Sequence, residues 1–533
     1  MKYLQKCCVL ILAVTIAAIA LRLPRLEQRP MHGDEAVHAV KFGSLLEHGL
    51  YRYDSNEYHG PTLNYFTLIP AWLTSAARLT DVSELTLRIV PVFFGILLVL
   101  LVFLLAGGLS WPAVIVAAAL TSISPAMVFY SRYYIQEMLL VCFTFGAIVS
   151  GYRYSQSKTV KWAILTGIFL GLMHATKETW VIVFGSMLIA LFLMLFTSYL
   201  QGESISNIIK VIRPRHLGAA ALTAAAVSAL FYSSFFTNPH GILDSLLTFK
   251  TYFNRASQNQ LHFHPWYYYL KILLYSRYAS GPVWSEGLIV ILAAAGFIVA
   301  ITRKGAAGIN FHLLRFIAFY TIVMIVLYSV VPYKTPWCLV GFLHGMILLA
   351  GVGTIAVLKL TRSVLPRTLV ILILLIGGAH LIWQAYLANY KYFADPVNPY
   401  VYAHPSRDVF TITRRIEEIA EVHPDRKNMY IQVICPESDY WPLPWYLRSF
   451  PNVGWWDHVD ENTPPAPLII ISATLAPQLT MKLYELPPPG EKNLYLPLFD
   501  SYTELRPQVE LLGFLTKDLW DSYQLHKSEL VHD

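Results

Sequence analysis

The residues of this 533-residue chain that are best suited to chemistry form one short motif, His32-Gly33-Asp34-Glu35-Ala36-Val37-His38, directly after the first apolar stretch. Carboxylates beside a hydrocarbon layer lose solvation, so they are usually paired, hydrated or functional. Asp34 can act as a general base toward a hydroxyl group. The alternative interpretation is a solvated loop followed by the acidic first turn of a helix.

Other polar and aromatic clusters follow between later apolar stretches. The cations Arg132, Lys177 and Lys334 can hold a phosphate and stabilise the charge on a departing phosphate oxygen. Each has a structural alternative, namely an intrahelical pair with Glu137, a solvated turn with Glu178, or a snorkelling side chain. Aromatic residues suit sugar faces and an isoprenoid tail, although most of the 33 tyrosines fit an ordinary interfacial belt. The predicted substrate-pocket residues are His32, His38, Tyr58, His59, Glu137, His174, Glu178, His264, Trp266 and Trp337.

Signatures of rival chemistries are absent from the sequence. It has no Gly-rich phosphate loop ending in Lys-Ser/Thr, no His-Glu-x-x-His and no Gly-x-Ser-x-Gly. The histidines and acids of the 32–38 motif could in principle ligate a divalent ion, but their spacing is not diagnostic. The five cysteines have no metal or redox spacing. We therefore expect no metal ligands and no required cofactor.

The elements that must position these residues are membrane helices. With 56% hydrophobic and 14% charged residues, the composition excludes an ordinary soluble protein. Leu63–Leu79, which carries Pro70 and Arg78, is predicted to be an amphipathic helix at the interface. About eleven apolar stretches are predicted to span the bilayer: 6–22, 88–106, 112–130, 135–151, 160–174, 179–199, 217–235, 284–301, 313–332, 337–358 and 367–387.

The charge pattern of the loops predicts the orientation in the cell membrane. The loops at 152–159, 200–216, 302–312 and 359–366, with the adjoining helix ends, are basic, and Glu203 is their only acid. Basic loops stay inside, so the N-terminus is predicted to be cytoplasmic, with the first apolar stretch retained as a helix. The net charge of +7 is then a topology signal, and no nucleic-acid partner is expected. All the polar clusters named above then lie on the outer side, with Asp34 in a first outer loop at 23–87.

The tail has a different character and is predicted to be an extracytoplasmic domain. Ser406 can cap a helix whose Val409, Ile412, Ile416 and Ile419 share one face. Met429–Cys435 and Pro467–Ser472 have the pattern of buried strands. Helix and strand in alternation predict a small α/β domain at 388–533 beside a membrane domain at 1–387.

Several motifs together resemble a known group of enzymes. The Asp34-Glu35 pair, Arg132 with Glu137, Ala175-Thr176-Lys177-Glu178, Pro265–Leu270 and Lys334–Trp337 resemble membrane glycosyltransferases of the protein O-mannosyltransferase and aminoarabinose-transferase type. The strings Gly33–Ala39, Tyr58–Pro61 and Tyr440–Arg448 are more similar to one subgroup, named for association with flippase activity in archaeal N-glycosylation.

This resemblance implies a GT-C fold, a polyprenyl-phosphate sugar as donor, an inverting reaction, Asp34 as catalytic base and Glu35 as its neighbour. The sequence departs from the oligosaccharyltransferase branch, which has Asp-x-Asp and a metal in its first loop. Here an Asp-Glu pair stands instead, which argues against a metal-dependent mechanism.

The combined prediction is a polytopic α-helical membrane glycosyltransferase of the EC 2.4 class. It would move a hexosyl- or pentosyl-type sugar from a polyprenyl phosphate to a glycan, lipid or protein acceptor at the outer face. The alternatives are a transporter or accessory protein that handles lipid-linked glycans, or a non-catalytic assembly subunit. A transporter should have paired broken helices at mid-membrane and polar residues on both faces, whereas this chain concentrates them on one.

Overall fold

The chain folds into two compact units. The computed structural model describes residues 2–54, 59–205, 212–258, 262–304, 308–488, 490 and 492–532, and only the backbone of 2–6, 250–258 and 529–532. The first unit comprises Met1–Leu26, Ser44–Ser75 and Glu84–Tyr402, and the second comprises Glu27–Gly43, Ala76–Ser83 and Ala403–Asp533. The domain boundary predicted at 387/388 follows membrane topology, whereas the compact units part after Tyr402. Two segments of the predicted first outer loop belong to the second unit.

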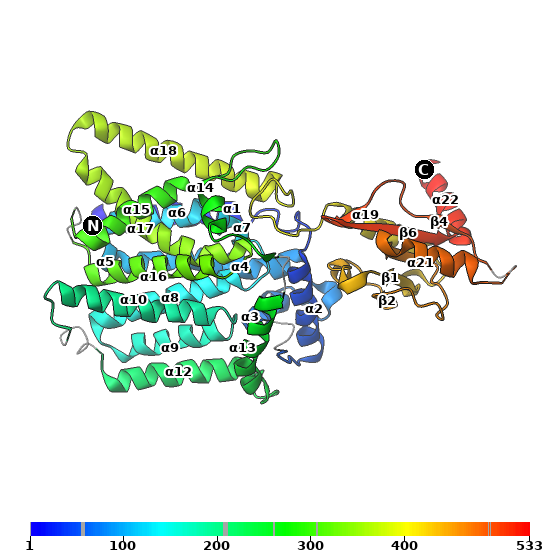
Figure 1. Cartoon of the computed structure of the whole chain (residues 1–533), viewed down its shortest axis with the longest axis horizontal. Helices are drawn as coiled ribbons and strands as arrows, with labels where there is room; N and C mark the ends of the chain where they lie inside the picture. The colour runs from blue at the N-terminus through cyan, green and yellow to red at the C-terminus, as the bar shows by residue number, and fades with distance from the viewer. Residues whose placement is uncertain are drawn as a thin grey trace. The chain divides into compact units, whose positions relative to one another are not determined.

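The first unit is helical, with long helices running side by side (Figure 1). Its helices are α1 (Lys2–Arg22), α3 (Thr62–Leu73), α4 (Glu84–Val102), α5 (Ala106–Leu109), α6 (Trp111–Ile123), α7 (Pro125–Ser131), α8 (Glu137–Ser157), α9 (Val160–His174), α10 (Trp180–Leu200), α12 (Pro214–Tyr232), α13 (Gly241–Gln258), α14 (Tyr268–Leu274), α15 (Gly287–Thr302), α16 (Phe311–Val330), α17 (Val340–Leu360) and α18 (Val364–Tyr386).

Each predicted span lies on one of these helices or, for 112–130, on the pair α6 and α7. Within the described part of the chain, six helices are long and apolar enough to cross a membrane, or seven if that bent pair counts as one span. Cys7–Arg22, Val160–His174 and Gly287–Thr302 are apolar but shorter. The polytopic character is therefore confirmed, and the count of eleven stays a prediction.

The predicted span 112–130 is broken. Its halves α6 and α7 meet at an angle of 59° around Ser124. A residue before proline is pushed out of the helical region by the proline ring, and Ser124, which precedes Pro125, has φ −57° and ψ 124°. The hydroxyl oxygen of Ser124 then accepts the N–H of Met127 at 3.4 Å and starts the second half.

Small residues let the helices of the first unit approach closely. A Cβ built on Gly167 of α9 would come within 2.3 Å of the Ala220 carbonyl oxygen on α12. One turn further along, a Cβ on Gly171 would lie 2.6 Å from the carbonyl oxygen of Ala224. Without a hydrophobic drive between helices in lipid, such close packing is what holds them together. Any larger residue at 167 or 171 would separate α9 from α12.

The second unit contains a mixed sheet. Its strands are β1 (Ile431–Ile434), β2 (Val453–Trp456), β3 (Leu468–Ser472), β4 (Tyr495–Pro497), β5 (Glu504–Arg506) and β6 (Val509–Thr516). They are ordered β2-β1-β3-β6-β4, with β5 also paired to β6. The β1 strand is parallel to β2 and β3, while β6 is antiparallel to β3 and β4. Because β1 and β3 are central, both are buried at every residue.

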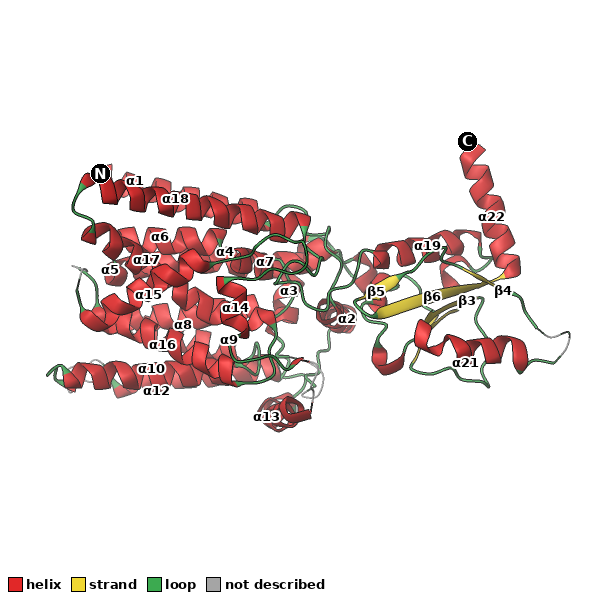
Figure 2. Ribbon diagram, turned by 45° about the horizontal axis from the view of Figure 1, so that its top comes forward, coloured by secondary structure: helices red, strands yellow, loops and turns green. Residues whose placement is uncertain are grey.

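The helices of the second unit are α19 (Asp408–Val422), α20 (Leu443–Tyr446), α21 (Ala476–Thr480), α22 (Lys517–His532) and the beginning of α2 (Gly33–His48). Figure 2 shows α19 and α21 on opposite sides of the sheet. All four apolar residues predicted to share a face of α19 are fully buried, and Ser406 accepts the N–H of Asp408 at 2.9 Å. The predicted small α/β domain is confirmed.

Candidate active site

Asp34 and Glu35 stand in the first turn of α2, where they take part in closing the helix start. The first N–H groups of a helix have no partner within it. Glu35 Oε2 accepts the backbone N–H of His32 at 3.0 Å, and His32 Nδ1 accepts the N–H of Asp34 at 3.0 Å. This two-way closure is similar to a capping box, with a histidine at the N-cap whose side chain accepts the N–H of N2 instead of that of N3.

The two carboxylates of the motif have different surroundings. Glu35 is fully buried, and its Oε1 accepts a charge-assisted hydrogen bond from Arg29 Nη2 at 3.0 Å. The Asp34 side chain is 52% exposed, with Oδ2 3.8 Å from His32 Nδ1. The positive end of the α2 dipole favours negative charge at both positions. Glu35 is thus bound into the fold, while about half of the Asp34 side chain, 52%, is exposed to solvent.

Within the second unit, the Tyr440–Arg448 string packs against the segment that precedes Asp34. The N–H of Met31 donates to the Tyr446 hydroxyl at 2.8 Å. A Cβ built on Gly33 would lie 3.8 Å from Trp441 Cβ. Two of the three strings that carried the subgroup resemblance, Gly33–Ala39 and Tyr440–Arg448, are therefore in contact although they lie far apart in the sequence.

The remaining histidines of the motif are buried in the same unit. His38 is 5% exposed and His32 is 6% exposed. The His32 ring lies 5.1 Å from the ring of His404, centroid to centroid. His404 was not singled out by the sequence, because nothing local connects it to the motif. Both histidines of the 32–38 motif, His32 and His38, are thus buried in the unit that contains Asp34.

Lys177 and Glu137 form a buried ion pair in the first unit. Lys177 Nζ donates to Glu137 Oε1, and the two side chains are only 8% and 6% exposed. Burial by itself would lower the pKa of Lys177, but Glu137, Cys338 and Glu178 together outweigh it and hold that pKa above the usual value. Lys177 is therefore a cation in the loop between α9 and α10.

Next in the chain, Glu178 anchors a second buried pair. His59 Nδ1 lies 2.7 Å from Glu178 Oε2, and the Tyr53 hydroxyl donates to Oε1 at 3.0 Å. The Tyr53 hydroxyl also bonds the Thr248 hydroxyl at 3.1 Å. Burial by itself would raise the pKa of Glu178, but His59, a backbone hydrogen bond and the charge of Lys177 together outweigh it, so that pKa lies below its usual value. A charged Glu178 orients the His59 imidazole, the arrangement by which carboxylates fix histidines in reactive sites.

The segment after His59 is held to the same loop by its backbone. A Cβ on Gly60 would meet the Ala175 carbonyl oxygen at 2.3 Å, so only glycine fits there. The Thr62 N–H donates to this oxygen at 3.2 Å. His174 contributes to the fold nearby, with Nδ1 2.6 Å from the Ser228 hydroxyl. Tyr58 lies outside the described residues.

Arg132 lies at the C-terminal end of α1. Its Nη1 donates to the carbonyls of Arg22 and Pro24, both at 2.7 Å, and its Nη2 donates to that of Arg25 at 3.1 Å. Its guanidinium also lies 4.8 Å from the ring centroid of Tyr390. Terminal helix carbonyls lack partners within the helix, so Arg132 caps α1. Its role toward a phosphate stays a prediction.

Lys334 joins two loop segments of the first unit. It is 1% exposed, and its Nζ donates to the His264 carbonyl at 3.1 Å and to the Val331 carbonyl. Burial lowers the pKa of Lys334. No third acceptor lies within hydrogen-bond distance of Nζ among the residues that the structure describes, so one N–H remains for a ligand. Trp337 is buried nearby in the chain, while Trp266 is 65% exposed.

Glu286 is a buried carboxylate that the sequence interpretation missed. Its Oε2 accepts the Ser124 hydroxyl at 2.5 Å, and its Oε1 accepts the Ala126 N–H at 3.0 Å and the Tyr400 hydroxyl at 2.9 Å. It therefore closes the start of α7 at the break of the span. The only signal for Glu286 in the sequence is that it is a single acid at the edge of an apolar stretch.

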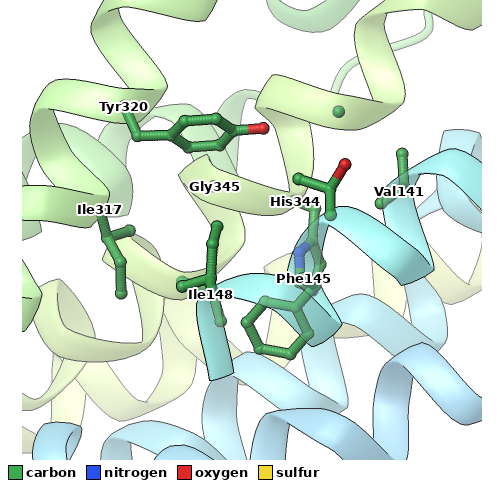
Figure 3. Close-up of a pocket in the computed structure, with 10 residues that line it drawn as sticks. Val141, Phe145, Ile148, Ile317, Tyr320, His344 and Gly345 are labelled. Atoms are coloured by element: carbon green, nitrogen blue, oxygen red, sulfur yellow. The ribbon is translucent and has the colours of Figure 1, made fainter. Parts of the chain in front are cut away.

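Two adjacent cavities lie between α8, α16 and α17. They are small, with volumes of about 10 and 20 Å³, and share Val141, Thr144, Tyr320 and Gly341 among their lining residues. Figure 3 shows one of them, with Tyr320 and His344 on its wall. The other is lined by Glu137. Both are mainly apolar, so neither resembles a sugar site.

The structure groups the predicted site residues into separate sets. Lys177 lies with Glu137 and His59 with Glu178 in the first unit, whereas Asp34 belongs to the second. Among the described residues, no group of three or more His, Cys, Asp or Glu is arranged to hold a metal ion. The expectation that no cofactor is required stays a prediction.

Residues 63–240 match the family model of dolichyl-phosphate-mannose-protein mannosyltransferase. Among curated proteins, none matches the sequence. The structure of ArnT from Cupriavidus metallidurans bound to undecaprenyl phosphate is similar with a TM-score of 0.61 at 14% identity, covering 95% of this chain and 97% of ArnT.

Two structures of the Archaeoglobus fulgidus oligosaccharyltransferase are also similar. The one tethered with an acceptor peptide has a TM-score of 0.55 at 14% identity, covering 84% of this chain and 63% of that one. The complex of this enzyme, AglB, with an inhibitory peptide and a dolichol-phosphate has a TM-score of 0.56 at 13% identity, covering 90% and 70%. The chain thus spans less than two thirds of the length of the oligosaccharyltransferase chain that is tethered with the acceptor peptide.

At such low identity the solved structures establish the fold, and the family match supplies the sequence relationship. The fold predicted from the motifs is confirmed, while the flippase-associated subgroup stays a prediction. Residues 63–240 thus match the dolichyl-phosphate-mannose-protein mannosyltransferase family, and the chain has the GT-C fold that it shares with the ArnT and oligosaccharyltransferase structures.

Proposed function

We propose that this protein transfers a sugar from a polyprenyl-phosphate donor to an acceptor at the outer face of the cell membrane. The observation that carries the proposal is the half-exposed Asp34 carboxylate, held at the start of α2 by the capping contacts of Glu35 and His32. The polyprenyl-phosphate donor is supported by the ArnT and AglB structures, which hold undecaprenyl phosphate and a dolichol-phosphate. Neither the family match nor these structures favour the transporter alternative.

In the proposed reaction Asp34 accepts the proton of an acceptor hydroxyl. The hydroxyl oxygen forms a bond to the anomeric carbon of the donor sugar. The bond from that carbon to the phosphate oxygen breaks on the opposite side, and the lipid phosphate leaves with the electron pair. Attack opposite the leaving group inverts the anomeric configuration. No metal or cofactor is needed for the atoms and charges to balance.

Lys334 is the cation best suited to the departing phosphate. One N–H of its ammonium group is not used by the two carbonyl acceptors. Because Lys334 is buried, water would compete little with a charge-assisted hydrogen bond to a phosphate. Arg132 and Lys177 would each have to exchange a present partner for the phosphate. Both are donor-binding candidates, but they are less suited to the phosphate than Lys334.

The release of free polyprenyl phosphate tests the proposed reaction. Purified protein in detergent, given a polyprenyl-phosphate sugar and an extract of candidate acceptors, is expected to release it. A transporter cannot produce this result, because detergent removes the two compartments that it needs. Lys334→Ala should lower donor use by about 10–100-fold, since hydrogen bonds to charged groups contribute roughly 1.5–3 kcal/mol.

The matched control is Lys271→Ala, which removes an exposed lysine of α14 and should leave turnover unchanged. No release by the wild-type protein would remove the transferase proposal. Release that is unaffected by both Lys334→Ala and Arg132→Ala would leave a transferase without the proposed cationic pocket.

Cysteine accessibility tests the proposed orientation. With the exposed Cys8 replaced by Ser, single cysteines at Gln156 and Glu417, both exposed, are labelled with a membrane-impermeant maleimide in intact cells. Basic inner loops predict that Glu417→Cys is labelled in intact cells and Gln156→Cys only after permeabilisation. Equal labelling of both before permeabilisation would overturn the topology and the outer-face site with it.

A further inference from the structure

The second unit carries a group of partly exposed aromatic side chains at the edge of its sheet. The β2 strand is the terminal strand of the order β2-β1-β3-β6-β4. Trp455 of β2, Tyr440 and Trp441 are each partly exposed, and together they are named the aromatic shelf. Each of these large aromatic side chains keeps part of its surface accessible to solvent, which makes the cluster a candidate for binding a ligand.

The rings of the aromatic shelf follow one another in space. The centroids of Tyr440 and Trp455 are 4.9 Å apart, with an angle of 42° between the rings. Those of Tyr440 and Trp441 are 6.1 Å apart, with an angle of 38°. Tyr440 is therefore the common neighbour of Trp455 and Trp441, and the three rings form one cluster.

One end of the aromatic shelf lies at the candidate base. A Cβ on Gly33 would be 3.8 Å from Trp441 Cβ, and Gly33 directly precedes Asp34 in α2. Trp441 is therefore in van der Waals range of the first residue of the helix that presents the Asp34 carboxylate. The aromatic shelf and Asp34 therefore belong to the same unit of the fold, with Trp441 beside the residue that precedes Asp34.

The charged residues that flank these rings in the sequence are acids. Glu437 and Asp439 precede Tyr440, and Asp457 follows the Trp455-Trp456 pair. Glu437 is exposed, Asp439 is paired with Arg506, and the exposed Asp457 carboxylate lies 2.5 Å from His458 Nδ1. Acids repel anionic lipid headgroups but accept hydrogen bonds from sugar hydroxyls. The C–H faces of a pyranose carry a small positive charge and pack on the negative faces of aromatic rings.

We propose that the aromatic shelf binds a saccharide, and that the acceptor in the transfer reaction is therefore a glycan. The acidic surroundings select a neutral or amino-bearing glycan over one that carries uronic acids. Binding of the saccharide does not depend on the transfer reaction, whereas its identity as the acceptor rests on the proposed function. A glycan seated on Trp441 would bring a terminal sugar to the end of the shelf at which Asp34 stands.

Saturation-transfer difference NMR on the full chain in detergent tests this binding. The probes are neutral tri- and tetrasaccharides of glucose, mannose, galactose and N-acetylglucosamine, with a glucuronic-acid trisaccharide for comparison. Wild-type protein should show transfer to at least one neutral probe and weaker transfer to the acidic one. Trp455→Ala and Tyr440→Ala should each weaken that binding about 10-fold, as expected for losing one stacking partner.

Trp520→Ala is the matched control, because Trp520 is a partly exposed tryptophan of α22 away from the shelf. It should bind as the wild type does, and so should Asp34→Asn, which removes only the proposed base. Thermal melting of each variant identifies any that fail to fold, and Trp455→Phe, which keeps an aromatic face, should retain most of the binding.

The absence of binding to every neutral probe, or binding that survives both shelf variants, would overturn the proposal. A second measurement uses brominated phospholipids in nanodiscs, which quench the fluorescence of nearby tryptophans. Quenching that is lost in Trp455→Phe would instead identify the shelf as a membrane contact. Loss of transfer in Asp34→Asn with saccharide binding retained would support both the shelf and the base. Binding without any transfer by the wild type would leave the shelf standing and remove the proposed function.

Discussion

Asp34→Asn is expected to lower sugar transfer by about 10²–10⁴-fold, the usual contribution of a general base. Asparagine keeps the size of the side chain and can still lie at the start of α2, but it cannot accept the proton of an acceptor hydroxyl. The capping contacts there are made by Glu35 Oε2, His32 Nδ1 and backbone N–H groups, and none of them uses the Asp34 carboxylate. Folding should therefore be unchanged while turnover falls.

The measurement is the rate of polyprenyl-phosphate release at saturating donor, with thermal melting in detergent as the folding check. Asp425→Asn is the matched control, because Asp425 is an exposed aspartate of the second unit. Its rate should equal that of the wild type. Near wild-type transfer by Asp34→Asn would reduce Asp34 to a structural residue and leave the base unassigned.

Lys177→Met is expected to destabilise the protein by roughly 3–5 kcal/mol. The substitution removes the partner of Glu137, whose side chain is 6% exposed, and leaves a buried charge without its cation. Most of the loss comes from that unpaired charge, because replacing a whole buried ion pair by apolar groups is often close to neutral. The double variant Glu137→Leu/Lys177→Met should therefore recover most of the stability.

Thermal melting in detergent measures both effects, and Lys158→Met serves as the control because Lys158 is an exposed lysine of the first unit. Transfer by the double variant then separates two roles for Lys177. A stable double variant with normal donor use would assign Lys177 to structure alone, while a stable variant with impaired donor use would support a contact to the phosphate. A small effect of Lys177→Met on melting would show that the pair is not buried as the structure has it.

The transmembrane helices could be predicted because their signal is local. A run of apolar residues must form its hydrogen bonds within itself in lipid, so a helix follows from composition alone. The spans 160–174 and 179–199 agree with α9 and α10 to within a residue. The break at Ser124-Pro125 also has a local signal, the proline itself. It was not predicted, because the residues on both sides form one continuous apolar run.

The tail was predicted in part for the same reason. The 3.6-residue spacing of Val409, Ile412, Ile416 and Ile419 specified a buried helix face, and unbroken apolar runs specified β1 and β3. The order of the sheet was not predictable, because β6 reaches β3 from more than thirty residues away and inserts antiparallel beside it. Strand order depends on which distant segments meet, and no spacing within one segment records that.

Sequence alone identified the residue types of the candidate site and the membrane helices that surround it, since both depend on short motifs and local hydropathy. It named Asp34 as the base and Glu35 as its neighbour, but it could not determine how exposed either carboxylate is. Only the tertiary structure did so, by burying Glu35 against Arg29 and leaving the Asp34 side chain 52% exposed. It likewise paired Lys177 with Glu137 and seated Glu286 at the start of α7. Burial and choice of partner are set by contacts between segments far apart in the chain, so they appear only once the chain has folded.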